Sequence, residues 1–332
     1  MWSERIPFAP LIFKCSYKVL NRRHIRVKVM QTLYSMRQSQ SDNLEKEERF
    51  LFQSIENVQD LYLIMVSILV EVQSKEDTLI EISRNKHLVT KEEKNPNLKF
   101  VNNKILTILA ENKSLLKALE DRNINNWKLN DDYILILLQA IKDSSLYKDY
   151  MSTTNSNFDE DSEFIASIFA EIIAPNIKLY EYLEDHKLTW IDDIPLVNTL
   201  ILKQLKAIKN TENGNFFVPK LYNDTEDKEF VGNLFRKVAL NDQELAKEFA
   251  DKTPNWEADR IAEIDTIILK MAICEFLKFP SIPAKVTINE YLELAKEYST
   301  PKSSIFINGI LDNLVKEFET NGKLKKTGRG LM

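Results

Sequence analysis

The sequence predicts an all-α protein, and three observations support this fold class. Its 332 residues include only 6 Gly and 10 Pro, whereas sheets and phosphate-binding loops use glycine at tight turns. Apolar residues recur at helical spacing along most of the chain. Two Thr-Pro pairs supply the capping side chain and first-turn proline of a helix start. We therefore expect long helices joined by polar connections.

Residues 1–20 are predicted to be an extension that precedes the fold. Their apolar stretch is short, Glu4 lies where a signal peptide would be basic, and no small-residue cleavage site follows. A signal peptide therefore fits poorly. We expect native translation to start near Val19 or Leu20, which would make the earlier residues a mis-assigned start. Peptides from upstream of Val19 in the endogenous protein would contradict this expectation.

Residues 21–74 are predicted to form two helices. The first, at 21–41, ends in the polar sequence SQSDN, and the second runs from about Leu44 to Val72. At roughly 100° per residue, the apolar side chains of the first helix share one face. These side chains are Ile25, Val29, Leu33 and Met36.

Residues 75–224 are predicted to be an inserted helical region. Its polar joints are rich in Asn, Ser, Asp and Lys, as loops are. The region shows no internal repeat and no motif that assigns it a role. Its helical runs are expected at about 100–119, 131–148, 161–185 and 194–209.

Residues 225–319 are predicted to form a second helical bundle. Two of its helix starts follow the Thr-Pro pairs at 253–254 and 300–301. The last residues, 320–332, carry lysines and an arginine among glycines, and we expect a basic disordered tail. The helices are expected at about 226–240, 242–250, 259–278, 284–298 and 301–319.

The overall charge and the scarce metal-binding residues exclude several classes of protein. The formal net charge is −5, so any nucleic-acid contact must come from a local basic patch. Two Cys and three His, none in ligand spacing, predict a reducing compartment and no metal site. No apolar run approaches the roughly 18 residues of a membrane span. We expect a soluble cytoplasmic protein without membrane association.

No catalytic motif is present, so we expect a protein that is not an enzyme and needs no cofactor. The chain has neither GxGxxG nor GxxxxGK[ST], and both cysteines lie outside a recognisable catalytic context. The acidic cluster at 159–161 is typical of a helix start, where carboxylates stabilise the positive end of the helix.

A basic helix at 22–34, with the sequence RRHIRVKVMQTLY, is a candidate RNA surface. Guanidinium groups can fork onto phosphates, and Tyr34 can stack on an unpaired base. The alternative on these residues alone is a solvated basic face without a ligand. A basic first turn opposes the helix dipole, which indicates a use other than helix stability. On a helix, one flank would carry Arg23, Arg26, Met30, Tyr34 and Arg37.

Three C-terminal segments carry a more specific pattern. They read DRIAEIDTIILKMAICEF at 259–276, PSIPAKVTINEYLELAK at 280–296 and IFINGILDNL at 305–314. In their order and spacing they resemble the NusB family, and the RR..R....Q.LY pattern of the basic helix resembles that family's opening helix. The resemblance covers residues 21–72 loosely and 226–316 well.

Much of this block is expected to be structural. Gly309 inside a helix costs ~1 kcal/mol relative to alanine, which predicts close approach of another helix. Glu290 is expected to pair locally, with Lys285 or Lys296, and has no predicted catalytic role.

The resemblance implies two small helical bundles that recognise RNA without turnover. NusB-like proteins bind the boxA element of nascent ribosomal RNA together with NusE, a small-subunit ribosomal protein. The complex joins RNA polymerase so that ribosomal RNA operons are read through, which is transcription antitermination. The RNA-binding residues implied in this chain are Arg22, Arg23, Arg26, Gln31, Tyr34, Tyr298, Lys302 and Phe306.

The chain also departs from the family's pattern. Lys302 stands where acidic residues are common, Ile305 where a basic one is common, and Cys274 where an aromatic one is usual. Family members are typically less than half as long, and the region at 75–224 has no counterpart in the resemblance. A helical protein-interaction scaffold that keeps the fold without binding RNA is therefore the alternative, which the net negative charge favours.

Overall fold

The computed structural model describes residues 18–211, 215–222, 224–252 and 262–331. Within these ranges the chain forms α-helices with short 3-10 and π segments, and its strand-like pairing is one isolated parallel bridge between Lys18 and Lys220. The all-α prediction is confirmed. None of the described helices is long and apolar enough to cross a membrane. Residues 1–17 of the predicted extension and the cap predicted at 253–254 lie outside the described residues.

The chain divides into two units, each made of segments that are distant in sequence. We call them the terminal unit and the central unit. The terminal unit comprises Leu20–Tyr62, Tyr180–Val197 and Tyr222–Met332. The central unit comprises Met1–Val19, Leu63–Leu179 and Asn198–Leu221. The boundaries differ from the predicted 75 and 224, because residues 63–74 belong to the central unit and residues 180–197 and 222–224 belong to the terminal unit.

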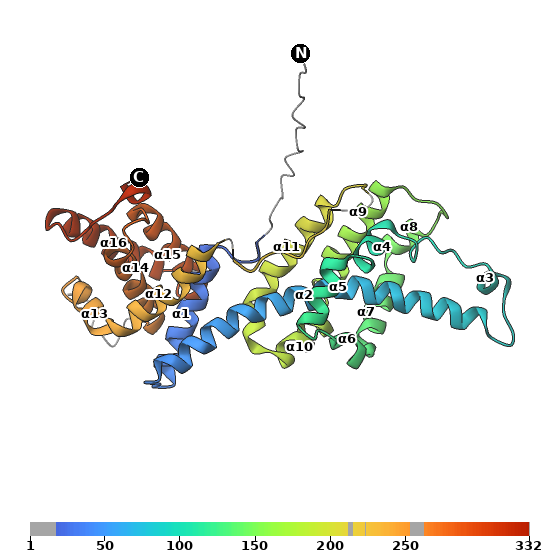
Figure 1. The fold of residues 1–332 in the computed structure, drawn as a ribbon, viewed down its shortest axis with the longest axis horizontal. Coiled ribbons are helices and arrows are strands. Elements are labelled where there is room, and N and C mark those ends of the chain that lie inside the picture. Colours follow the sequence, from blue (N-terminus) through green and yellow to red (C-terminus); the bar gives the residue numbers. More distant parts are fainter. Residues whose placement is uncertain (1–17, 212–214, 223, 253–261, 332) are drawn as a thin grey trace, which may run out of the picture. The chain divides into compact units, whose positions relative to one another are not determined.

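The terminal unit is built around one buried helix, α14. Residues 267–276 of α14 are all buried, charged side chains included, so the helix is enclosed on every side. It contacts α1, α12, α13, α15 and α16, which are drawn together in Figure 1. The helices that lie wholly in this unit are α1 (Arg22–Gln38), α12 (Thr225–Leu240), α13 (Asp242–Ala250), α14 (Glu263–Lys278), α15 (Ala284–Tyr298), α16 (Ser303–Thr320) and the 3-10 segments η2 (Leu188–Asp193) and η4 (Gly328–Leu331).

Three helices cross a unit boundary. They are α2 (Leu44–Arg84), α10 (Ile177–His186) and α11 (Ile194–Ala207). The α2 helix is longer than predicted, since it ends at Arg84 rather than near 72.

The central unit consists of shorter helices that polar side chains terminate. Asn103, Asn112 and Asn157 each accept a backbone N–H at a helix start, and Ser144 does the same before α8. The run predicted at 100–119 is therefore broken at Asn112. The helices wholly in this unit are α3 (Lys91–Lys94), α4 (Lys104–Ala110), α5 (Lys113–Asp121), α6 (Asn126–Leu129), α7 (Asp131–Asp143), α8 (Ser145–Tyr150), α9 (Phe158–Ile168) and the π segment η1 (Phe169–Ile173).

The C-terminal residues are ordered rather than disordered as predicted. The Lys326 ammonium donates to the carbonyl oxygens of Glu275 (3.3 Å) and Phe279 (3.1 Å), which end α14. A cation at this end of a helix is favourable, because it lies at the negative end of the helix dipole. The Thr327 N–H bonds to the Pro280 carbonyl at 3.0 Å, and a Cβ at Gly330 would lie 2.0 Å from the same oxygen. The lysine-rich sequence thus packs against the fold.

The prediction for Gly309 is wrong. A Cβ built on this residue of α16 would meet nothing within 4 Å, and Gly309 is exposed. Within the described ranges no helix approaches there, so no packing contact in this part of the chain requires the glycine.

Candidate nucleic-acid interface

Helix α1 begins at a capping box. The Asn21 side chain accepts the N–H groups of Arg23 (2.9 Å) and His24 (3.1 Å), and the Asn21 N–H points back to Nδ1 of His24 at 3.4 Å. Burial and the neighbouring Arg23 lower the pKa of His24 to about 4. His24 is therefore neutral at pH 7, which leaves Nδ1 free to accept. The box fixes the position of the arginines that follow.

Arg26 lies in the interior of the terminal unit. Its guanidinium forks onto the Glu275 carboxylate at 2.8 and 3.0 Å, and both side chains are at most 2% exposed. Thr287 and Tyr291 donate to the same carboxylate at 2.7 and 3.2 Å. The guanidinium also lies 5.4 Å from the centre of the Phe230 ring. The predicted RNA contact of Arg26 is therefore corrected to a structural one, because its donors face a buried acid.

Arg22 and Arg23 lie at the surface, and each has an acidic partner. Arg22 bonds to Asp227 at 2.9 Å and reaches Glu226 at 3.4 Å. Arg23 forms a two-bond fork with Glu290 at 3.0 and 3.1 Å. Their side chains are 35% and 41% exposed, so water reaches both guanidinium groups. The local pairing predicted for Glu290 is wrong, since Lys296 instead bonds to Glu293 at 2.7 Å.

An open depression of about 630 Å³ lies at the start of α1. Both surface arginines line it, facing the segment that leads into α15. Pro283 occupies the N-cap position of α15 and offers no side-chain cap, so the first N–H groups of that helix lack a partner within it. Guanidinium groups beside a helix start favour an anion. The lining residues are Asn21, Arg22, Arg23, His24, Arg26, Ser281, Ile282, Pro283, Val286 and Glu290.

A second flank of α1 faces the acidic segment η2. The buried Lys28 ammonium bonds to Asp193 at 2.6 Å, and the Gln31 amide donates to Asp192 at 2.5 Å. Burial raises the pKa of Asp193 to about 6 although Lys28 opposes the shift. Burial and the negative charges of Asp192, Glu297 and Asp193 raise the pKa of Tyr298. Gln31 and Tyr298 are thus brought to one acidic neighbourhood.

The remaining predicted residues lie at or near the surface. Tyr34 is 39% exposed near the end of α1. Lys302 is exposed at the N-cap position of α16, and Phe306 is half-buried in the first turn of that helix. The flank predicted to carry Arg23 through Arg37 is therefore exposed at both ends and buried in the middle, where Met30 is fully enclosed.

The acidic partners of α1 were not predicted from the sequence. Glu275 and Glu290 lie in the C-terminal block, where an acid among apolar residues was the available signal. Asp192 and Asp193 lie in a joint of the region predicted as an insert, and no signal pointed to them. Within the described part of the chain, no group of three or more His, Cys, Asp or Glu side chains could hold a metal ion.

Comparisons with known proteins assign the C-terminal part of the chain. A model of the NusB family matches residues 195–316, a range that does not include α1. A protein of Salinibacter ruber called transcription antitermination protein NusB is 44% identical over 110 residues, which are 33% of this chain and 68% of that protein. Proteins with the same name from Chloroherpeton thalassium and Clostridium kluyveri are 43% identical over 109 residues and 42% over 91. These alignments cover 33% and 27% of this chain.

The chain spans 52% and 58% of the lengths of the last two relatives, so little more than half of each is matched. No solved structure matches the chain significantly. The matched range of the family model starts at 195, upstream of the bundle predicted from 225 onward.

Proposed function

The chain belongs to the NusB family, and from this premise we propose that it is a non-enzymatic, RNA-binding transcription antitermination factor. It acts on ribosomal RNA operons by binding boxA-type single-stranded RNA together with NusE, and it reaches RNA polymerase only through that complex. Recognition rather than turnover is the mechanism.

The observation that carries this proposal is the depression at the start of α1. Arg22 and Arg23 present forked donors there. Their partners Glu226 and Glu290 are exposed or partly exposed carboxylates, whereas Asp227, which also bonds to Arg22, is buried. An exposed ion pair contributes only about 0–1 kcal/mol, because water competes for both charges. An RNA phosphate can therefore take the place of Glu226 or Glu290 at small cost. Arg26 positions this surface by tying α1 to α14 and does not touch the RNA.

Aromatic and amide groups further along α1 and α16 complete the proposed surface. Tyr34 offers an exposed ring for stacking on an unpaired base, and Lys302 offers an exposed ammonium for phosphate. Gln31, Tyr298 and Phe306 would border the RNA path. Contact with Gln31 and Tyr298 requires the RNA to pass close to Asp192. NusE provides part of the remaining RNA-binding surface.

The alternative function is a protein-interaction scaffold that does not bind RNA. One specific observation favours it: each arginine in the first two turns of α1 has a carboxylate partner within this chain. The basic patch is thereby neutralised before any ligand arrives.

The test is binding of the full chain to a fluorescent boxA-type RNA in the presence of NusE. We expect Arg22→Gln/Arg23→Gln to weaken binding at least tenfold and to make the log–log salt dependence shallower by about 1.4, since about 0.7 is lost per single-strand phosphate. The charge-matched control is Arg49→Gln/Arg236→Gln, on exposed arginines of the terminal unit that do not line the depression. Unchanged affinity of the α1 variant would favour the scaffold.

A further inference from the structure

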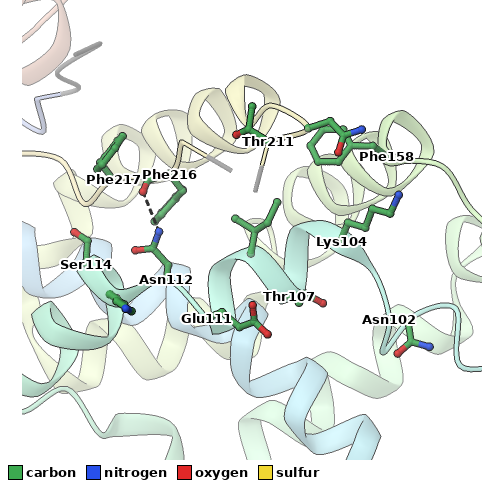
Figure 2. Close-up of a pocket in the computed structure, with 13 residues that line it drawn as sticks. Asn102, Lys104, Thr107, Glu111, Asn112, Ser114, Phe158, Thr211, Phe216 and Phe217 are labelled. Atoms are coloured by element: carbon green, nitrogen blue, oxygen red, sulfur yellow. Dashed lines mark hydrogen bonds between the residues drawn. The ribbon is translucent and has the colours of Figure 1, made fainter. Parts of the chain in front are cut away.

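The central unit contains a groove that the proposed function does not use. It encloses about 1050 Å³, whereas pockets for small molecules usually enclose roughly 300–1,000 Å³. Figure 2 shows Phe217 and Phe158 near its two ends, with Thr211 between them and Asn112 and Glu111 on the opposite side. The lining residues are Asn102, Lys104, Thr107, Ile108, Glu111, Asn112, Lys113, Ser114, Phe158, Asn210, Thr211, Phe216 and Phe217.

Two side-chain amides hold an aromatic ring outward at one end of the groove. Asn112 donates to the Phe216 carbonyl at 2.9 Å and Gln204 donates to the Phe217 carbonyl at 3.0 Å. Successive side chains of an extended segment point to opposite sides, so Phe216 is buried while Phe217 is 58% exposed. The backbone is therefore fixed while a large apolar ring faces water. A rigid, exposed ring is a platform on which a flat group can stack.

The groove also carries cationic groups without an acidic partner. Lys104 and Lys113 are both exposed, and among the residues that the structure describes neither ammonium forms an ion pair or hydrogen bond. Lys113 is the first residue of α5, and the positive end of that helix adds to the same potential. Among the described residues of the lining, Glu111 carries the one carboxylate, so these residues together have a net positive charge.

We propose that this groove binds single-stranded RNA, with a base stacked on Phe217 and phosphates held by Lys104 and Lys113. An aromatic side chain beside flexible lysine side chains can bind single-stranded nucleic acid without strict sequence preference, because every base has a π face that can stack. Exposed amide and hydroxyl groups of Asn102, Asn210 and Ser114 can meet base edges, and Glu111 can accept from a base amino group. The inference goes beyond the proposed function, since it assigns an RNA site to the unit outside the depression at α1.

The first test measures the anisotropy of a fluorescent oligouridylate of about 12 nucleotides, within the span that single-strand sites occupy. On the full chain, Phe217→Ala is expected to weaken binding about tenfold, as loss of one stacked base does. Lys104→Gln/Lys113→Gln is expected to weaken it at low salt and to make the salt dependence shallower by about 1.4. Because Phe217, Lys104 and Lys113 are all exposed, their variants should keep the wild-type circular dichroism spectrum.

The control is Lys91→Gln/Lys94→Gln, which removes two exposed lysines of α3 that do not line the groove. Equal weakening in this control would overturn the proposal, since charge alone would then explain binding. Unchanged affinity of Phe217→Ala would overturn it as well, as would binding of an acidic peptide but not of RNA.

A second measurement keeps this site distinct from the one at α1. Photocross-linking with 4-thiouridine RNA is expected to label the peptide that contains Phe217, and to do so equally in Arg22→Gln/Arg23→Gln. Loss of the cross-link only in the α1 variant would overturn the proposal. Loss of boxA binding in the α1 variant, with the cross-link retained, would leave both sites standing.

Discussion

The basic residues of α1 and those of the central groove differ in what neutralises them. Arg22, Arg23 and Arg26 each meet a carboxylate of the terminal unit. Lys104 and Lys113 meet none among the described residues. Helix α1 has the stronger basic motif, yet its positive charges are already paired with carboxylates of the same chain. The number of basic residues in a sequence segment does not show how many of them are free to bind a ligand. Acidic residues that are distant in sequence can already neutralise them.

The largest expected effect is on stability, and it tests the buried Arg26–Glu275 pair. Arg26→Met should lower the free energy of unfolding by about 3–5 kcal/mol, because it leaves the Glu275 carboxylate buried without its partner. Urea denaturation followed by circular dichroism measures the loss. Replacing both members, as Arg26→Met/Glu275→Leu, should recover only part of it, because the buried Thr287 and Tyr291 hydroxyls then lose their acceptor. A loss below about 1 kcal/mol in the single variant would mean that the pair is not desolvated.

The next effect is a pH dependence at the start of α1. Because the pKa of His24 is lowered to about 4, the folded state holds fewer protons than the unfolded state between pH 4 and 6.5. The His24 contribution is therefore present in full above about pH 6.5 and is lost as the pH falls toward 4. Relative to His24→Gln, the wild type should lose about 2 kcal/mol between pH 7 and pH 4.5.

Glutamine is the informative replacement for His24, since its side-chain oxygen can accept the Asn21 N–H at any pH. Unfolding midpoints in urea at the two pH values provide the measurement. Parallel pH profiles for the two proteins would show that His24 does not titrate as its burial implies.

A smaller effect is expected at the exposed arginines. Arg23→Gln should lower the free energy of unfolding by about 1 kcal/mol or less, because the Arg23–Glu290 pair is open to water. Arg22→Gln should lower it by about 1–2 kcal/mol, because it also removes a hydrogen bond to the buried Asp227 carboxylate. Thermal denaturation measures the change in stability, and the RNA-binding assay measures the change in affinity for the same variant. A large loss of stability would make α1 a structural element only, and would remove the contrast between Arg26 and its neighbours.

The smallest effect belongs to the groove. Lys104→Gln/Lys113→Gln should leave the free energy of unfolding within about 0.5 kcal/mol of the wild type, as surface changes without partners do. The same variant is expected to lose RNA affinity. Loss of stability instead of affinity would show that these ammonium groups have a structural partner, and the two regions would then no longer differ.

Helix positions could be predicted from the sequence where residues close together in the chain determine them. The C-terminal helices and α1 lie close to their predicted ranges, because apolar spacing and caps determine them over a few residues. The run at 100–119 was misjudged, since Asn112 caps a new helix inside an apolar stretch. Composition also suggested disorder after 320, whereas Lys326 binds the carbonyl groups that end α14.

The predicted interface was harder to read, because its contacts are distant in sequence. Arg26 and Glu275 are 249 residues apart, and no local pattern distinguishes Arg26 from the exposed Arg23. Gln31 meets Asp192, which belongs to a joint with no motif. The groove escaped notice for the same reason, since Phe217 and Lys104 come from segments that share no periodicity.

The division of the terminal unit among three stretches of sequence has a consequence for synthesis on the ribosome. Arg26 emerges 249 residues before Glu275, its carboxylate partner. The long contiguous part of the central unit, Leu63–Leu179, leaves the ribosome between them and can fold first. The Arg26 guanidinium therefore has no carboxylate partner while the central unit is being made. The terminal unit can close only after α14 and Lys326 have been synthesised.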